Sequence, residues 1–143
     1  MESDDLAEHD IAPEECWTLL RSGEVGRVVF TDRALPAIQP VRYAVLDRQI
    51  VIASAARARW AAAVRDAVVA FQVDSFDPAG LRAWSVVVTG RARPLPPLTG
   101  GARGLLAGPA LTAIAAELVT GRRVTTMETP DPAALSVGRH RRT

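Results

Sequence analysis

The distribution of apolar residues along the chain predicts a protein built mainly from short strands, with one helix before them. That helix is predicted over 13–22, because Pro13 suits the first helical position and Gly23 suits the position after the last turn. Its apolar face consists of residues at helical spacing: Cys16, Leu19 and Leu20.

Six segments have the composition of strands. They are rich in β-branched and aromatic residues and are separated by turn-forming residues. The predicted strands are 25–31, 37–46, 49–53, 67–73, 81–93 and 122–128. Pro40 falls inside the second strand and is expected at an unpaired edge or a bulge, because proline has no N–H for a ladder hydrogen bond. Tight turns are expected at 32–34, at Asp47-Arg48 and at 77–80.

Two further segments have helical spacing. In 57–66, Trp60 and Val64 lie four residues apart and share one face. In 109–119, apolar residues follow the i, i+3, i+4, i+7 pattern of a buried helix face: Leu111, Ile114, Ala115 and Leu118. The predicted order is therefore helix, three strands, helix, two strands, helix, strand.

This order predicts a mainly β (α+β) protein, a six-stranded antiparallel split β-barrel flanked by short helices. With 143 residues and 48% hydrophobic content, one domain is expected, and we place it at 11–129. Residues 1–10 are predicted to be a disordered acidic leader, and 130–143 a basic tail that stays solvated and binds no nucleic acid.

Composition places the protein in the cytoplasm and away from membranes. No apolar run approaches the roughly 20 residues of a membrane span, and the acidic N-terminus lacks the apolar segment of a signal peptide. The single cysteine, Cys16, fits a reducing compartment. All basic side chains other than histidine are arginines, since the chain contains no lysine.

Metal and nucleophile chemistry is not expected. The two histidines, His9 and His140, lie near opposite ends of the chain, and Cys16 is their only potential thiolate companion. A structural zinc site or a Ser–His or Cys–His pair would need such residues together. We therefore predict no metal site and no catalytic residue.

Arginines near a predicted turn are the main candidates for ligand binding. Arg57 and Arg59 follow Ser54 between a strand and a helix, where guanidinium groups and free backbone N–H groups can meet a phosphate. The alternative is a solvated basic turn. Arg42, beside Tyr43 on the second strand, could supply a third contact or belong to an exposed strand face.

Trp84 and Ser85 begin the last strand of the predicted hairpin. Alternation places Trp84, Val86 and Val88 on one face and Ser85 and Val87 on the other. Both faces are largely apolar, so the strand should be buried on both sides, by the barrel core and by a second subunit. Trp84 fills the core or edges a flat ligand at the barrel rim.

In the order and spacing of its segments, the chain resembles the pyridoxamine 5′-phosphate oxidase-like superfamily of flavin-binding split β-barrels, in particular its small bacterial members. The resemblance spans about 14–124. It is carried by Cys16-Trp17-Thr18-Leu19-Leu20, Val25-Gly26-Arg27-Val28-Val29-Phe30, Pro40-Val41-Arg42-Tyr43, Val68-Val69-Ala70-Phe71-Gln72-Val73-Asp74, Trp84-Ser85-Val86-Val87-Val88-Thr89-Gly90-Arg91-Ala92 and Gly121-Arg122-Arg123.

The resemblance implies a homodimer with two FMN sites at the subunit interface. Arg57 and Arg59 would bind the flavin phosphate. Val41, Arg42, Tyr43 and Ser54 would border the ring system and ribityl chain, and Trp84 and Ser85 would reach the flavin from the partner subunit. The implied function is that of an FMN-dependent oxidoreductase acting on a small molecule.

The sequence departs from relatives at the turn before Arg59. Relatives often carry glycine and threonine there, whereas this chain has Ala55-Ala56-Arg57-Ala58, and Arg42 replaces a smaller or amide residue. Two alternatives therefore stand beside FMN: a reductase that uses a deazaflavin coenzyme, and a binding or sensor module on the same fold without a cofactor. The residues that true pyridoxamine phosphate oxidases use for their substrate are not recognisable.

Overall fold

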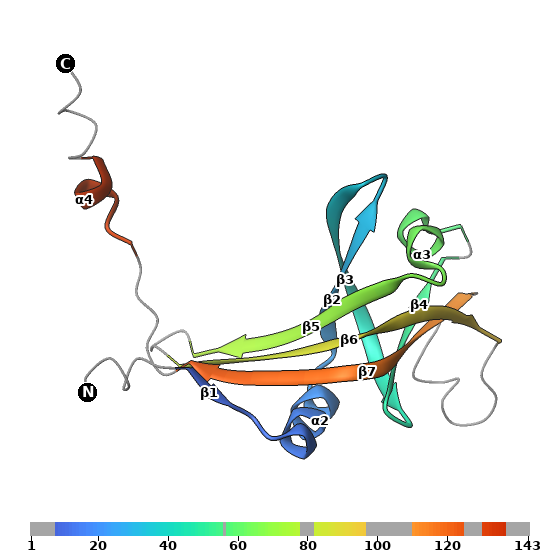
Figure 1. Ribbon diagram of the computed structural model, residues 1–143, viewed down its shortest axis with the longest axis horizontal. Coiled ribbons are helices and arrows are strands. Elements are labelled where there is room, and N and C mark those ends of the chain that lie inside the picture. Colours follow the sequence, from blue (N-terminus) through green and yellow to red (C-terminus); the bar gives the residue numbers. More distant parts are fainter. Residues whose placement is uncertain (1–7, 56, 78–81, 97–109, 125–129, 137–143) are drawn as a thin grey trace.

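A computed structural model describes residues 8–55, 57–77, 82–96, 110–124 and 130–136. Strands dominate these residues, with three helices between or after them (Figure 1). The elements are β1 Glu8–Asp10, α2 Pro13–Ser22, β2 Val25–Asp32, β3 Leu35–Leu46, β4 Gln49–Ser54, α3 Arg59–Val64, β5 Val68–Phe76, β6 Ala83–Leu95, β7 Ala110–Val124 and α4 Pro132–Ser136.

Antiparallel pairing closes six of the strands into a barrel. The sheet runs β1-β7-β4-β3-β2-β5-β6, and β6 also pairs with β7, which joins its two ends. The longest ladder joins β6 to β7, from Ala83↔Val124 to Leu95↔Leu111. The predicted mainly β split barrel is thus confirmed. In Figure 1, the ends of β5, β6 and β7 extend beyond the barrel on the side where β1 joins β7.

Local sequence signals account for the first helix and the first three strands of the barrel. The helix predicted over 13–22 is α2, and the strands predicted from 25 to 53 are β2, β3 and β4. Both intervening turns consist of two residues with positive φ, 51° and 66° at Arg33 and Ala34 and 49° and 59° at Asp47 and Arg48. This geometry matches the right-handed twist of a tight hairpin. Pro40 pairs only with Arg27 of β2, so its other side is an unpaired edge, as predicted.

The predicted hairpin is β5 and β6, paired from Val68↔Arg91 to Phe76↔Ala83. Its turn lies partly outside the described residues, which omit 78–81. The helix predicted over 57–66 is the shorter α3, in which Val64 is fully buried and Trp60 packs against the core.

The helix predicted over 109–119 is wrong, because this segment forms the long strand β7. Its first half pairs with β4 along one edge and β6 along the other. Ile114 packs in the main core, and Leu111 and Ala113 pack in a smaller cluster with Val51. Both faces are therefore covered, and four consecutive residues are buried: Leu111, Thr112, Ala113 and Ile114. A strand buried on both faces has no alternating pattern, and its apolar spacing resembles that of a buried helix. The strand predicted over 122–128 is, in its described part, the end of β7.

The predicted disordered leader is wrong at residues 8–10, which form β1 and pair with Arg122, Arg123 and Val124 of β7. Residues 1–7 lie outside the described part, as do most of the connection between β6 and β7 and residues 137–143 of the predicted basic tail. The described part of that tail contains the short helix α4, in which the Asp131 carboxylate accepts a hydrogen bond from the Ala133 N–H at 2.9 Å.

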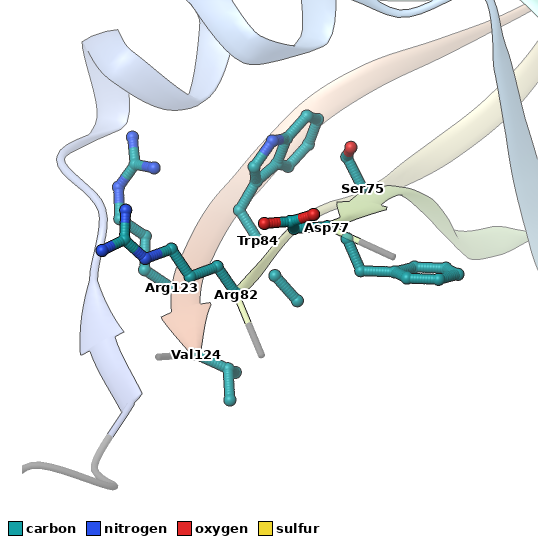
Figure 2. A pocket seen from close by; sticks show the side chains of 8 residues that line it. Ser75, Asp77, Arg82, Trp84, Arg123 and Val124 are labelled. Carbon is teal, nitrogen blue, oxygen red and sulfur yellow. The ribbon is translucent and has the colours of Figure 1, made fainter. Parts of the chain in front are cut away.

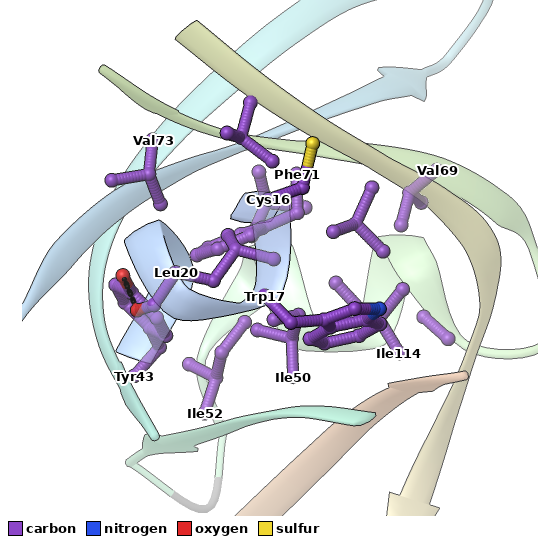
Figure 3. Packing of buried hydrophobic residues seen from close by; sticks show 14 of the residues in the cluster. Cys16, Trp17, Leu20, Tyr43, Ile50, Ile52, Val69, Phe71, Val73 and Ile114 are labelled. Carbon is purple, nitrogen blue, oxygen red and sulfur yellow. Dashed lines mark hydrogen bonds between the residues drawn. The ribbon is translucent and has the colours of Figure 1, made fainter. Parts of the chain in front are cut away.

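One core fills the barrel, and α2 contributes its apolar face to it (Figure 3). Cys16, Trp17 and Leu20 of α2 are almost completely buried and lie among aliphatic and aromatic side chains of the strands. The largest strand residues that are fully buried are Ile50, Ile52, Phe71 and Ile114. Burying side chains of this size contributes about 1.5–3 kcal/mol each. This packing holds α2 against the barrel.

Candidate functional site

The barrel opens where β3 and β4 separate. Their pairing ends at Tyr43↔Ile52, after which Val41 and Arg42 continue along β2 while Ser54 continues along β7. Val41 and Ser54 are half-buried, and Arg42 is exposed. The fold therefore brings Val41, Arg42 and Ser54 to one split in the barrel wall.

Three arginines line a pocket of about 300 Å³ beside this split, which we call the arginine pocket. Arg57 precedes α3, Arg65 follows it, and Arg93 comes from β6. The other lining residues are small or apolar apart from one threonine: Ala58, Ala61, Ala62, Pro94, Ala110, Leu111 and Thr112. Among the described residues, no carboxylate lies within ion-pair distance of these three guanidinium groups. The pocket is therefore suited to an anion.

Arg59 lies apart from the arginine pocket. Its Nη2 is 3.5 Å from Oδ2 of Asp32, near the tip of the β2–β3 hairpin, and its side chain is 68% exposed. An exposed ion pair of this kind is weak, so it does not fix Arg59 in place. The structure thus directs Arg57 and Arg59 to different neighbours.

Tyr43 is part of the core. Its hydroxyl donates a hydrogen bond of 2.5 Å to the Leu20 carbonyl, and its ring meets Phe71 edge-on at 4.9 Å between centroids. Burial raises the pKa of Tyr43 to about 12, so the hydroxyl stays protonated and able to donate. These contacts join β3 to the end of α2, which gives Tyr43 a structural role.

Trp84 and Ser85 face opposite sides of β6. Ser85 accepts a 2.9 Å hydrogen bond from Nε2 of Gln72 and lines a shallow hollow of about 360 Å³ on the outer sheet face. Trp84 packs against the core side and lines a different pocket at the strand ends (Figure 2). One ligand on one chain cannot lie against both side chains from the same face.

The predicted contacts divide between the two ends of β7. Ser54 pairs with Ala110 at the start of that strand, and Trp84 pairs with Arg123 near its end. A strand rises 3.2–3.4 Å per residue, so these positions are roughly 40 Å apart along β7. Within one chain, Val41, Arg42 and Ser54 lie at the split and Arg57 lines the pocket that starts beside Ala110, the partner of Ser54, whereas Trp84 and Ser85 are distant.

The predicted site residues did not include the arginines and the amide that also line these two hollows: Arg65, Arg93, Gln72 and Arg122. Arg93 faces the arginine pocket because it pairs with Ala113 of β7, a segment predicted to be helical. No local signal could have identified Arg93, since its position depends on that long-range register.

Two features are absent from the described residues. None of the helices in this part of the chain is both long and apolar enough to cross a membrane. The same residues contain no group of three or more histidine, cysteine, aspartate or glutamate side chains that could hold a metal ion.

The chain is similar to several known proteins. A family model described as pyridoxamine 5′-phosphate oxidase matches residues 12–99. "Uncharacterized protein Rv0080" of Mycobacterium tuberculosis is 44% identical over 84 residues, which are 55% of this chain and 55% of that protein. The match thus spans about half the length of this curated relative.

Solved structures extend the similarity to most of the chain. A FAD binding protein from Mycobacterium smegmatis superposes with a TM-score of 0.68 at 27% identity, covering 82% of this chain and 98% of the other. A FAD-binding protein from Mesorhizobium loti gives a TM-score of 0.69 at 26% identity with the same coverage. The family model matches more than half the length of this chain, and the chain folds into a similar barrel. The chain therefore belongs to the pyridoxamine 5′-phosphate oxidase family.

Proposed function

We propose that this protein binds a flavin nucleotide and acts, as a homodimer, as an oxidoreductase on a small organic molecule. The arginine pocket at the split of the barrel is the observation that carries the proposal. The similar structures from M. smegmatis and M. loti, which are described as FAD-binding proteins, support it. The flavin would supply the redox chemistry, and the protein would bind and orient it.

The arginine pocket fits the phosphate end of such a nucleotide. Guanidinium groups bind phosphate through paired, charge-assisted hydrogen bonds. The pocket is lined by three such groups from separate places in the chain: Arg57 before α3, Arg65 after it and Arg93 in β6. Because α3 has only six residues and Ala58 at its N-cap offers no side-chain hydrogen bond, the arginines, rather than the helix end, would supply the attraction. Val41, Arg42 and Ser54 would border the rest of the nucleotide.

One chain offers only part of the site. A volume of about 300 Å³ is at the low end for a ligand pocket. A second copy, packed against the outer face of β5, β6 and β7, would bring its Ser85, Gln72 and Arg122 toward the split. That face exposes apolar side chains, including Val68 and Leu118, which are 54% and 58% exposed.

The test is ligand binding by the purified protein. FMN, FAD and the deazaflavin coenzyme are each added, and the flavin absorbance spectrum and the shift in melting temperature are recorded, since a ligand that binds the native state raises its stability. We expect at least one of them to raise the melting temperature, and we expect FMN to be the ligand that does so. Arg93→Gln should weaken binding about tenfold, the effect of losing one charged hydrogen bond. Arg33→Gln, in the exposed β2–β3 turn, serves as the matched control.

A cofactor-free binding module is the second candidate. Its support is the run of alanines around α3, Ala55, Ala58, Ala61 and Ala62, which offers no side-chain hydrogen bonds near Arg57. A dimer whose spectrum and melting temperature respond to none of the three cofactors would favour this candidate and contradict the first.

A further inference from the structure

We infer that a second pocket, at the ends of β5, β6 and β7, binds a small flat monoanion of the aromatic carboxylate class. This hairpin-end pocket has a volume of about 540 Å³, larger than the arginine pocket and within the range of ligand sites. Its lining consists of Ser75, Phe76, Asp77, Arg82, Ala83, Trp84, Arg123 and Val124 (Figure 2).

Strand register builds one wall of this pocket. Ser75, Trp84 and Arg123 are direct neighbours across β5, β6 and β7, so their side chains form a row on one face of the sheet. The next residues inward on that face, Val73 and Val86, are buried in the core. Trp84 therefore lies where the apolar core ends, with one side packed and the other toward the pocket. An indole in this position offers a flat apolar surface to an aromatic ring.

Two arginines line the pocket, and one of them is available to a ligand. Figure 2 shows the side chains of Arg82 and Arg123 on the same side of Trp84. The Arg123 guanidinium forms an ion pair with Glu15 of α2, which holds it in place. Within the described part of the chain, Arg82 has no carboxylate at ion-pair distance. Its guanidinium is thus the group available to bind a ligand carboxylate through two parallel hydrogen bonds.

The balance of charge selects a single negative charge. The lining contains two arginines and one carboxylate, Asp77, which lies near Trp84 in Figure 2. Glu15 already offsets the charge of Arg123, so Arg82 is left to balance one ligand charge, and a dianion such as a phosphate ester would bring a second charge that the described lining does not offset. A monoanion with a flat apolar body matches both the guanidinium of Arg82 and the indole of Trp84.

Within one chain, this pocket is separate from the arginine pocket. Trp84 faces away from Ser85 and lies at the opposite end of β7 from the arginine pocket. The inference therefore does not depend on flavin binding and can succeed or fail independently of it.

Calorimetric titration of the full-length protein tests the inference, first without and then with FMN. Benzoate is the probe, benzamide its neutral analogue and phthalate its dianionic analogue. We expect benzoate to bind at least tenfold more tightly than either analogue. Arg82→Gln should weaken benzoate binding about tenfold, and Trp84→Leu should weaken it while Trp84→Phe, which keeps a flat ring, restores most of it.

Two variants serve as controls. Arg21→Gln, on the exposed side of α2, is the matched control and should bind benzoate as the unaltered protein does. Arg93→Gln removes a charge from the arginine pocket and should also leave benzoate binding unchanged. Equal binding of benzoate and benzamide, no binding of benzoate, or a loss in Arg93→Gln but not in Arg82→Gln would overturn the inference.

Discussion

Two neighbouring residues, Arg42 and Tyr43, show how strand alternation assigns opposite roles to adjacent side chains. Arg42 is exposed beside the split of the barrel. Tyr43, in contrast, points into the core, and its hydroxyl donates a hydrogen bond to the Leu20 carbonyl. Of these two residues, only Arg42 is placed where it could contact a ligand at the split, and Tyr43 instead fixes the end of α2.

The hydroxyl of Tyr43 also explains why position 23 is a glycine. A Cβ at Gly23 would lie 2.4 Å from that hydroxyl oxygen and 3.2 Å from Cγ1 of Val73. We predict that Gly23→Ala lowers the free energy of unfolding by about 1–3 kcal/mol, the usual cost of overpacking, and that Tyr43→Phe alone costs about 1 kcal/mol for the lost hydrogen bond.

The double variant distinguishes this clash from a general glycine effect. Because Tyr43→Phe removes the atom nearest to the added Cβ, Gly23→Ala should cost much less in that background. Urea denaturation of the four proteins measures the coupling. Strictly additive costs would show that the Tyr43 hydroxyl is not what excludes a side chain at position 23.

At the scale of elements, β7 holds the barrel together. It pairs with β4, β6 and β1, so it contributes to closure of the barrel and also carries the short N-terminal strand. Its register against β6 shifts at Thr89/Gly90, where Thr89 pairs with Leu118 and Gly90 with Ala116. A bulge of this kind bends the strand locally and increases its twist.

Gly90 is predicted to be essential to that bulge. A Cβ at this position would lie 1.8 Å from the Ala115 carbonyl oxygen, a backbone atom that cannot move without breaking the ladder. We expect Gly90→Ala to destabilise the protein by about 3 kcal/mol or more. The control is Thr89→Ala at the neighbouring position, where the half-buried side chain points to the outer face of the sheet. This substitution should cost about 1 kcal/mol or less. Thermal unfolding followed by circular dichroism compares the two, and equal melting temperatures would contradict the prediction.

At the scale of the whole molecule, the proposed flavin contacts lie at opposite ends of one chain. Packing the outer sheet faces of two copies together is the arrangement we propose to unite them. The same packing would cover apolar side chains that one chain leaves in water, such as Leu118 and Val68, and burial of apolar surface is the main drive for association.

Leu118→Asp tests this arrangement. The side chain is 58% exposed in a single chain, so the substitution should cost an isolated chain about 0.5 kcal/mol or less. Placed in an apolar interface, however, the unpaired carboxylate should abolish the dimer. Analytical ultracentrifugation should show the mass fall from two chains to one, and flavin binding should weaken in parallel.

Leu135→Asp is the matched control, because Leu135 lies in α4, outside the sheet, and is 70% exposed. It should leave the mass and the flavin affinity unchanged. A protein that is a monomer before any substitution would contradict the proposed arrangement.

The sequence by itself determined most of the elements, because their signals are local. Helix α2 has a proline at its start and one apolar face. The hairpin of β2 and β3 has a tight turn between strands, as does that of β3 and β4. These features depend on residues within a few positions of one another, and the order of short strands then limited the fold to an antiparallel barrel. The arginine at position 57 was also identifiable, since it lies directly beside a strand–helix junction.

Only the tertiary structure decided the rest, because it depends on pairings between distant segments. Residues 109–119, which include the first part of β7, were predicted as a helix, since burial of both strand faces removes the alternation that would reveal a strand. Strand β1 has no apolar pattern and exists because its backbone pairs with the end of β7. The meeting of Arg93 with Arg57, and the opposite facing of Trp84 and Ser85, likewise follow from strand register, which local residue spacing does not encode.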